Sequence, residues 1–594
     1  MSGFSISAPL FESLLILLVL CWDYIFLLPH CLWTRTLRLD LSRLPPRAAD
    51  VLAALVVIPS LLRSRDELTS MMATVESVAS NGYRGDLIIV VSIDGYGDAP
   101  ALYGELQQWA ERRFWNDHHW LHVTGTPGRR GKPLAIEQGV SYLRDLVDRG
   151  VHAAFPPVYV STDADADLGP LALEHLVARL RRRHPLTGWP ARAVAGNLYI
   201  RGNDFWRGWK HFLTVEGQLR IQVAREYMVS NVARHNLRWM PVGGVPGVLY
   251  CTWSEIILAA PRFLGYMRTL TARDWLKWWI GIEPPKFCET RAAPLPELIA
   301  GDTDDTVSAY MAIIARRKHG RFVFDPPRTP MHAFLYLLRA VFLDRALRYE
   351  PEARVYTSSP TRVRALFKQR RRWNCSRIEV TGRFGRALWF HWSLGLPAAG
   401  ILLLIAKSVA VGGLMYLALP MALFKSSVLT AFVLGYSCQL AAYAMLTTFA
   451  LVINGDLGLV RVLAALPLSP LYAICFAYAP SVVGGVSDVL LFGNVTGFAP
   501  EWTLIAGGSS RVGLLFRLRR ALLLAVRSVV RGDVPFGAFW FGWGQTPWTP
   551  SGYEGWTTGK RPRPIVPPAS TWFRSREKST AARANEAPRS GRTP

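Results

Sequence analysis

The sequence is poor in cysteine and lacks the common cysteine patterns. Its 594 residues include seven cysteines, which are scattered along the chain and form no CxxC pair. We therefore expect neither a disulfide framework nor a zinc site. Zinc-finger spacing and a helix-turn-helix pattern are also missing, so the net charge of +25 does not indicate nucleic acid. We expect no nucleic-acid partner and attribute the excess of lysine and arginine to anionic lipid head groups and a pyrophosphate ligand.

Charged side chains are absent from residues 1–8, whereas apolar residues make up half of the whole chain. The first apolar run has no positive segment before it and no cleavage site, so residues 1–33 predict a transmembrane helix rather than a cleaved signal. The arginines that follow, at 35–47, place the next segment in the cytoplasm. Residues 387–492 predict about four more transmembrane helices. We therefore expect a lipid-bilayer partner and a multi-pass protein of the plasma (cell inner) membrane with its large soluble domain in the cytoplasm.

Between residues 50 and 330, short apolar runs alternate with charged, helix-like segments. The runs of strand length are Leu52–Ile58, Leu87–Ile93 and Val158–Val160, and Leu171–Arg183 is helix-like. This alternation is typical of a mainly parallel α/β sheet, here expected within a multi-pass α-helical transmembrane protein. The other segments predict interfacial amphipathic helices (331–386), an amphipathic helix with a following loop (505–565) and a disordered basic tail (566–594).

Closely spaced carboxylates follow the third of these predicted strands. The run Val158–Val160 leads into Ser-Thr-Asp163-Ala-Asp165-Ala-Asp167, and α/β sheets bind ligands outside the carboxyl ends of their strands. Two carboxylates one residue apart are suited to hold Mg²⁺ or Mn²⁺ beside a diphosphate, whose oxygens complete the coordination. The alternative is a solvated acidic turn that caps the next helix.

A second predicted strand ends at Asp94, and a glycine-rich basic loop carries Lys132. The carboxylate of Asp94 is suited to accept hydrogen bonds from a uracil ring or a ribose, and Lys132 is placed to meet the nucleotide. The loop Gly128-Arg-Arg-Gly-Lys-Pro is not a P-loop, because Thr126 stands where the first glycine belongs and a proline follows the lysine. ATP binding is therefore disfavoured.

A third acidic group, Gly301-Asp302-Thr-Asp304-Asp305-Thr306, opens the helix-like stretch Val307–Arg317. A carboxylate here is the type of residue that removes a proton from an acceptor hydroxyl. Helix capping, which the helix dipole favours for acids, is the alternative.

The segment Lys368-Gln-Arg-Arg-Arg-Trp373 combines guanidinium groups with an indole. Guanidinium groups bind phosphate oxygens bidentately, and an indole is suited to stack on a sugar ring. An interfacial anchor is the alternative for this charge run.

In this order, the motifs resemble those of the processive family-2 glycosyltransferases, which include hyaluronan, chitin and cellulose synthases. The resemblance covers roughly residues 50–410, and its most specific part is the Q-x-x-R-W pattern of Gln369, Arg372 and Trp373. It implies a GT-A fold, a metal-bound nucleoside diphosphate and a channel through which the growing polymer leaves.

The resemblance also implies a role for each matching residue. Asp305 would be the general base, with Asp304 beside it, although the extra acid Asp302 leaves open which of the three it is. Residues that would bind the donor nucleotide are Asp94, Lys132, Asp163, Arg372, Trp556 and Lys560. The last two lie in the gating-like segment of 505–565, which is similar to the gating segment of hyaluronan synthases, although the match is partial. Residues that would bind the metal are Asp165 and Asp163. Residues that would bind the acceptor are Gln369, Trp373 and Gly244.

The expected activity is that of an inverting hexosyltransferase of family 2. It would polymerise a β-linked polysaccharide from a UDP-sugar, with the growing glycan as acceptor, and translocate it across the membrane as an exopolysaccharide. The alternative is a non-processive enzyme that adds one sugar to a lipid, as ceramide glucosyltransferases do. A catalytically dead partner that scaffolds polymer is a rival from another class. The motifs do not identify the sugar, although an N-acetylglucosamine-containing product is preferred.

Overall fold

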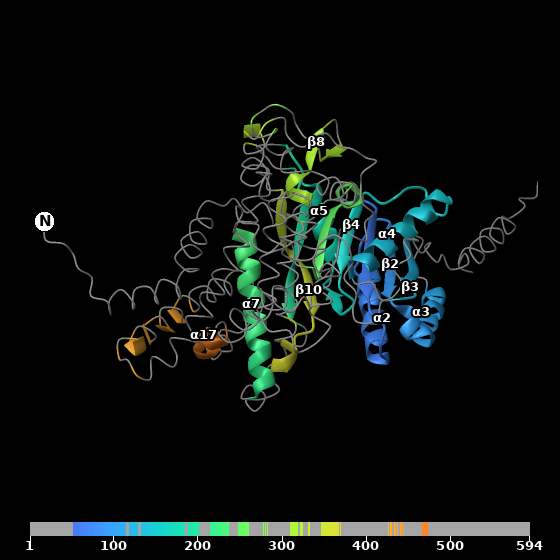
Figure 1. Cartoon of the computed structure of the whole chain (residues 1–594). Coiled ribbons are helices and arrows are strands. Elements are labelled where there is room, and N and C mark those ends of the chain that lie inside the picture. The colour runs from blue at the N-terminus through green and yellow to red at the C-terminus, as the bar shows by residue number, and fades with distance from the viewer. Residues whose placement is uncertain are drawn as a thin grey trace, which may run out of the picture.

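The protein contains one eight-stranded sheet with helices packed against it (Figure 1). The computed structural model describes residues 51–113, 118–128, 132–183, 188–200, 214–236, 247–259, 311–318, 321–324, 346–360 and 362–366, together with scattered positions between 277 and 472. The strand order is β3-β2-β1-β4-β7-β6-β10-β5. All structural statements below concern this described part of the chain.

The first half of the sheet is parallel. Its strands are β1 (Ala54–Ser60), β2 (Leu87–Asp94), β3 (His119–Thr126) and β4 (Val158–Thr162). The helices between them are α2 (Arg65–Ala79), α3 (Pro100–Arg112) and α4 (Lys132–Asp148). Parallel neighbours need such crossover connections, and strands covered on both faces read as continuous apolar runs. The β1 sequence Ala-Leu-Val-Val-Ile-Pro fits this rule, since all six residues are buried.

The second half of the sheet is mixed. Its strands are β7 (Leu249–Trp253), β6 (Ala193–Ile200), β10 (Leu347–Thr357) and β5 (Ala166–Leu168). Strand β7 is antiparallel to both β4 and β6, whereas β10 is parallel to β6 and antiparallel to β5. The sheet is therefore mixed, because β7 and β5 run opposite to the other six strands. Those six run in one direction, which agrees with the mainly parallel sheet that the sequence predicts. The sheet also extends beyond residue 330, the predicted end of the α/β domain, because β10 belongs to it.

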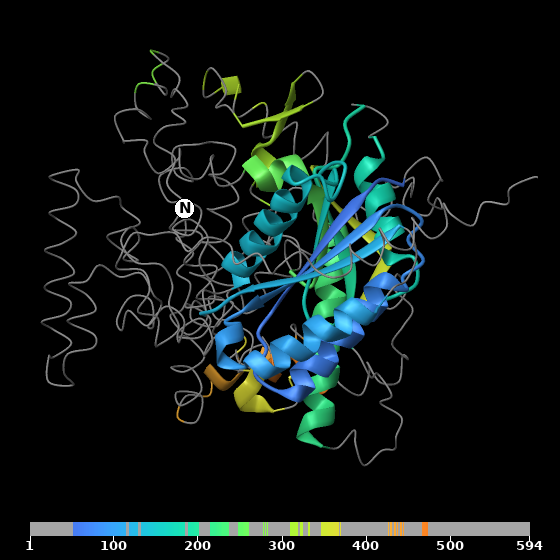
Figure 2. The ribbon, with the colours of Figure 1, turned by 90° about the vertical axis from the view of Figure 1, so that its right-hand side faces the viewer.

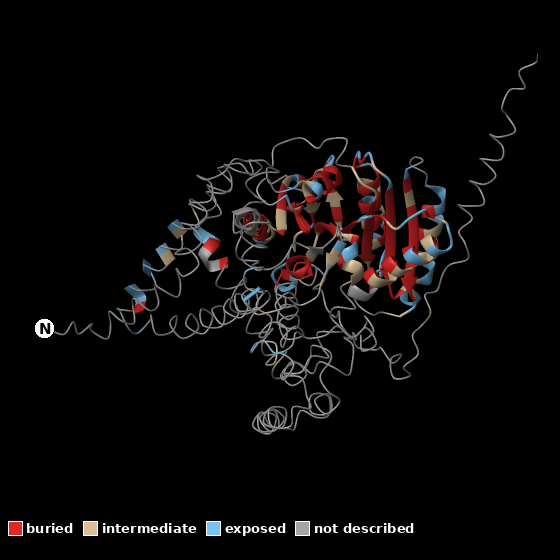
Figure 3. Cartoon of the chain, turned by 90° about the horizontal axis from the view of Figure 1, so that it is seen from above, coloured by how far each residue is buried: buried red, intermediate tan, exposed pale blue. Residues whose placement is uncertain are grey.

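Helices cover both faces of the sheet (Figure 2). Alternate side chains of a strand point to opposite faces. Val56 and Ile58 of β1 accordingly pack in the cluster that contains α2, α3, α5 (Ala172–Arg181) and α7 (Val215–Asn236). Leu55 and Val57 pack in the second cluster, with Val140 and other residues of α4. The strands are consequently the most buried part of the molecule (Figure 3).

Short elements complete the described structure. They are η3 (Tyr96–Asp98), β8 (Arg316–Lys318), β9 (Arg321–Val323), η7 (Leu466–Leu468) and α17 (Ser469–Tyr472). Strands β8 and β9 form a separate antiparallel pair. Helix α17 contacts α7, since the Tyr472 hydroxyl donates to Glu226 Oε2 at 2.9 Å and the Ser469 hydroxyl donates to Gln222 Oε1 at 3.0 Å.

The α/β part of the predicted fold class is confirmed, and its transmembrane part is wrong for the described chain. None of the described helices has the length and apolarity that a bilayer span requires. The longest of them, α7, has 22 residues but carries charged side chains along its length, among them Glu216, Arg220 and Arg225. The predicted segments 1–33, 505–565 and 566–594, and nearly all of 387–492, lie outside the described residues.

Candidate functional site

The carboxyl ends of the parallel strands bring two predicted acidic residues to the same edge of the sheet. In the observed register, Val57 of β1 lies opposite both Val90 of β2 and Ser161 of β4. Asp94 ends β2 four residues after Val90, and Asp163 follows Ser161 by two residues, just beyond the end of β4. One strand separates β2 from β4, which corresponds to about 10 Å across the sheet. Asp94 and Asp163 therefore lie at the carboxyl ends of β2 and β4, with the end of β1 between these two strand ends.

Asp94 is buried at the last position of β2, with 4% of its surface exposed. The Thr126 hydroxyl, at the end of β3, donates to the Gly128 carbonyl oxygen at 2.9 Å and also lies 3.4 Å from Asp94 Oδ1. The next residue, Gly95, has a φ of +79°, which residues with a side chain rarely adopt. Its amide donates to the Thr126 carbonyl oxygen at 3.1 Å. The sharp turn at Gly95 thus stops β2 at the carboxylate.

Lys132 and Asp163 form an ion pair at this edge. Lys132 is the first residue of α4, and its Nζ lies 2.7 Å from Asp163 Oδ1, just beyond β4. The two side chains are 20% and 32% exposed, so the pair is partly shielded from water. Two residues that the sequence predicted to bind a nucleotide are thus in direct contact, and the lysine places a positive charge beside the acidic loop.

Asp165 accepts hydrogen bonds from the end of β10. The Ser358 hydroxyl donates to Asp165 Oδ2 at 2.7 Å, and the Thr357 hydroxyl lies at 3.5 Å from the same oxygen. Sequence reasoning missed both hydroxyl residues, because almost 200 positions separate them from the aspartate. No local sequence signal would have revealed this contact, which depends on the pairing of β10 with β5.

The acidic loop of Asp163, Ala164 and Asp165 is also held from the side of α2. The Thr74 hydroxyl donates to the Ala164 carbonyl oxygen at 2.9 Å, and the Ser77 hydroxyl oxygen accepts from the Leu168 amide at 3.2 Å. Within the loop, the Ala166 amide donates to the Asp163 carbonyl oxygen at 3.3 Å. Buried backbone groups of the loop are thereby satisfied, which favours a single loop conformation.

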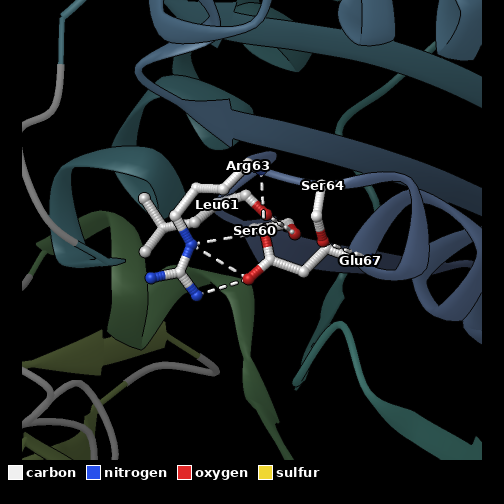
Figure 4. A network of polar contacts seen from close by, with 5 residues as sticks. All are labelled: Ser60, Leu61, Arg63, Ser64 and Glu67. Carbon is white, nitrogen blue, oxygen red and sulfur yellow. Dashed lines mark hydrogen bonds and ion pairs between the residues drawn. The ribbon is translucent and has the colours of Figure 1, made fainter.

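The turn between β1 and α2 lies at the same sheet edge, because β1 lies between β2 and β4 in the sheet. Figure 4 shows the side chains of this turn. Ser64 caps α2 by accepting from the Glu67 amide, while Glu67 accepts from the Arg63 amide at 2.7 Å and from the Arg63 guanidinium. Burial raises the pKa of Glu67, but the hydrogen bonds from Arg63 outweigh it and leave that pKa below its ordinary value. Ser64 and Glu67 match the Ser-x-x-Glu pattern of a capping box, a local signal from which this turn could have been predicted.

The residues of this edge suit a hard divalent ion. The described residues contain no group of three or more His, Cys, Asp or Glu side chains arranged to hold a metal ion. Asp163 and Asp165 supply carboxylate oxygens, which are preferred ligands of Mg²⁺ and Mn²⁺, and both ions are commonly held by one or two carboxylates together with phosphate oxygens. The site thus fits an ion that arrives with a diphosphate better than one bound by protein alone.

Several predicted site residues lie outside the described chain, and their roles stay predictions. They are Gly244, Asp304, Asp305, Arg372, Trp373, Trp556 and Lys560. Gln369 is described, and its side-chain oxygen is buried without a hydrogen-bond partner in the described structure. A buried amide oxygen of this kind has a hydrogen-bonding capacity that a ligand hydroxyl would satisfy.

The fold and this edge together define an α/β domain with acidic strand ends suited to a metal-bound diphosphate. No family model matches the sequence, and no curated protein matches it. A mannosyltransferase from Pyrobaculum calidifontis, determined in complex with GDP-Man and Mn²⁺, is similar over 77% of this chain and 98% of its own, with 14% identity and a TM-score of 0.34. GalNAc-T7 with UDP, GalNAc and Mn²⁺ is similar over 28% of this chain and 26% of its own, with 15% identity and a TM-score of 0.19. These similarities are too weak to assign a function, which must come from the site residues.

Proposed function

We propose that this chain is a glycosyltransferase that uses a nucleotide-sugar donor together with Mg²⁺ or Mn²⁺. The observation that carries the proposal is the meeting of the sequence motifs at one sheet edge. Asp94, Lys132 and the acidic loop are separated by tens of residues in the sequence, yet the parallel register and the 2.7 Å ion pair bring them to the same place. Ligands of open α/β sheets bind at this edge.

In this proposal, each described residue has a distinct task. Asp94 accepts hydrogen bonds from the nucleoside, and Asp163 and Asp165 hold the divalent ion and the nucleotide. The bound ion would neutralise negative charge that develops on the leaving diphosphate. Lys132 adds a second positive charge at the site, because its ammonium group lies next to Asp163. Both charges favour departure of the diphosphate in a site of reduced dielectric constant.

The acceptor side of the reaction rests on the sequence motifs and on Gln369. A base must remove the proton of the acceptor hydroxyl as that oxygen attacks the anomeric carbon, and inversion follows from direct displacement of the diphosphate. Asp305 is our choice for the base, with Asp304 and Asp302 as the other acids of its motif. The unpartnered side-chain oxygen of Gln369 supports a hydrogen bond to the acceptor.

The finer proposal is that UDP-sugars are added repeatedly to a growing β-linked glycan. The Q-x-x-R-W motif at Gln369, Arg372 and Trp373, the most specific part of the resemblance to processive enzymes, supports this proposal. The alternative is transfer of a single sugar to a lipid by an enzyme of the ceramide glucosyltransferase type, which also carries an R-W signature. The predicted plasma-membrane location stays a prediction.

One experiment tests both levels of the proposal. Purified full-length protein is incubated with Mn²⁺ and a panel of radiolabelled UDP- and GDP-sugars, and the products are separated by size. Metal-dependent transfer to a distribution of long products is the expected result. A single small glycolipid product would refute polymer synthesis but keep the glycosyltransferase assignment, whereas no transfer from any donor would contradict the assignment itself.

The base assignment has its own test. Asp305→Asn is expected to abolish transfer and leave UDP binding unchanged, as measured by calorimetry on the same preparation. If the variant transferred sugar at the wild-type rate, the base would be another acid of the motif, Asp302 or Asp304.

A further inference from the structure

We infer that Ser358, assisted by Thr357, is a positioning residue that orients the metal-binding carboxylate of Asp165. This inference rests on the proposed function and adds a residue to its site. The hydroxyl of Ser358 donates to Asp165 Oδ2 at 2.7 Å, a distance typical of a charge-assisted hydrogen bond between a hydroxyl and a carboxylate. Partners that orient metal ligands in this way usually influence metal affinity strongly.

The backbone around Ser358 places its hydroxyl in a defined position. Strand β10 pairs with β5 so that Thr357 lies opposite Ala166 and Tyr356 lies opposite Asp167. The Gly169 amide donates to the Arg354 carbonyl oxygen at 2.9 Å. A side chain at Gly169 would place its Cβ 3.1 Å from Arg354 Cβ, so glycine permits this close approach. The acidic loop is thereby fixed between β4 before it and the β5–β10 pair after it.

The two hydroxyls act on one oxygen of the carboxylate. Both Ser358 and Thr357 contact Oδ2 of Asp165, so neither uses the lone pairs of Oδ1. A carboxylate has about four lone-pair sites on its two oxygens. Hydrogen bonds at Oδ2 restrict rotation of the carboxylate, so the end of β10 limits the directions in which Oδ1 faces.

Strand β10 is also followed along the chain by the Q-x-x-R-W segment of the predicted site. Gln369 follows Ser358 by eleven residues along the chain. The segment that carries the Q-x-x-R-W motif therefore begins shortly after the residue that orients Asp165. A substitution at the end of β10 that alters Ser358 would directly change the hydrogen bonding of the Asp165 carboxylate.

The test compares Mn²⁺ binding by the wild-type chain and by Ser358→Ala. Free Mn²⁺ is measured by electron paramagnetic resonance in the presence of saturating UDP, and the series is repeated with GDP. Ser358→Ala should weaken Mn²⁺ binding about tenfold, the lower end of the range for such partners, because Ser358 is exposed. Ser358→Thr retains the hydroxyl and should recover most of the affinity. Thr357→Val should have a smaller effect, in keeping with its 3.5 Å distance.

A matched control separates orientation of the metal ligand from a general loss of structure. Ser80→Ala removes another exposed serine hydroxyl, which donates to the Glu76 carbonyl oxygen within its own helix, and should bind Mn²⁺ like the wild type. Excess Mn²⁺ should restore sugar transfer by Ser358→Ala. If Ser358→Ala bound Mn²⁺ as tightly as the wild type, whether or not its melting temperature fell, this inference would be overturned and the proposed function would stand. Failure of the wild type to bind Mn²⁺ with either nucleotide would overturn the proposed function and this inference with it.

Discussion

The parallel half of the sheet comes from one continuous segment, residues 54–162, whereas the mixed half combines strands found between residues 166 and 357. In the parallel half, each strand ends at the same edge, so successive βα units deliver Asp94, Lys132 and Asp163 to one place. In the mixed half, β10 returns from a distant part of the chain and holds Asp165 through Ser358. Under the proposed function, one half would supply the ligand-binding groups and the other would orient them.

The largest effect should come from the parallel half, on removal of the charge of Asp163. Asp163→Asn should reduce metal-dependent donor turnover by about 100-fold or more, because the variant loses a metal ligand and the partner of Lys132. Asp66→Asn, at an exposed position in the first turn of α2, is the matched control and should retain full turnover. Similar rates in the two variants, measured as nucleotide release, would remove Asp163 from the site.

Ionisable groups in the two halves of the sheet should change the unfolding free energy in opposite directions as pH rises. Burial raises the pKa of Glu350 in β10 to about 7, although Arg179 counteracts this. A raised carboxyl pKa means that the folded state binds the proton more tightly, so stability falls as pH rises from about 4.5 to 7, by roughly 3 kcal/mol. Burial lowers the pKa of His122 in β3 to about 3, so its contribution is present above pH 6.5 and is lost as pH falls toward 3.

Denaturant unfolding across this pH range checks the difference between the halves. Glu350→Gln should remove the loss of stability between pH 5 and 8, relative to the wild type. His122→Gln should leave the stability between pH 6.5 and 8 unaltered and reduce the loss that occurs as pH falls below 6.5, at the cost of the 3.0 Å contact with His152. Parallel stability curves for the wild type and Glu350→Gln would contradict the raised pKa.

Replacement of Lys132 should have a smaller effect, which is on the affinity for nucleotide. Lys132→Met should weaken UDP binding in the presence of Mn²⁺ about tenfold, or about 1.4 kcal/mol, because the diphosphate loses a cation. Mn²⁺ binding without nucleotide should become tighter, since the ammonium group no longer neutralises Asp163. Calorimetry measures both affinities. Equal losses in the two experiments would indicate damage to the loop rather than a role for the lysine charge.

The smallest effect should come from the exposed side of the β1–α2 turn. Glu67→Gln should cost at most about 1 kcal/mol of unfolding free energy, because Arg63 and Glu67 are 55% and 30% exposed. Thermal unfolding at low and high salt measures this cost. A loss of several kcal/mol would show that the turn is coupled to the sheet core.

The parallel half could be predicted from the sequence to a large extent. Strands β1, β2 and β4 lie where apolar runs placed them, because strands covered on both faces leave a continuous apolar pattern. Strand β3 escaped prediction, since His119, His122 and two threonines interrupt its apolar character.

The mixed half could not be predicted in the same way. Strand β10 contains Arg348, Glu350 and Arg354, and its polar composition does not indicate a strand in the interior of a sheet. Its place depends on long-range pairing with β6 and β5. The contact between Ser358 and Asp165 follows from that pairing and could be found only in the folded chain.

Nucleotide binding by the wild-type protein is the most direct test of the account. UDP and GDP are titrated into the purified chain with Mn²⁺ and, separately, with EDTA, and the heat of binding is recorded. The account predicts saturable binding of at least one nucleotide with Mn²⁺, strongly weakened by EDTA and by Asp163→Asn. Binding that is absent, or that is equal with Mn²⁺ and EDTA, would contradict a metal-dependent sugar-nucleotide site at the edge of the parallel strands.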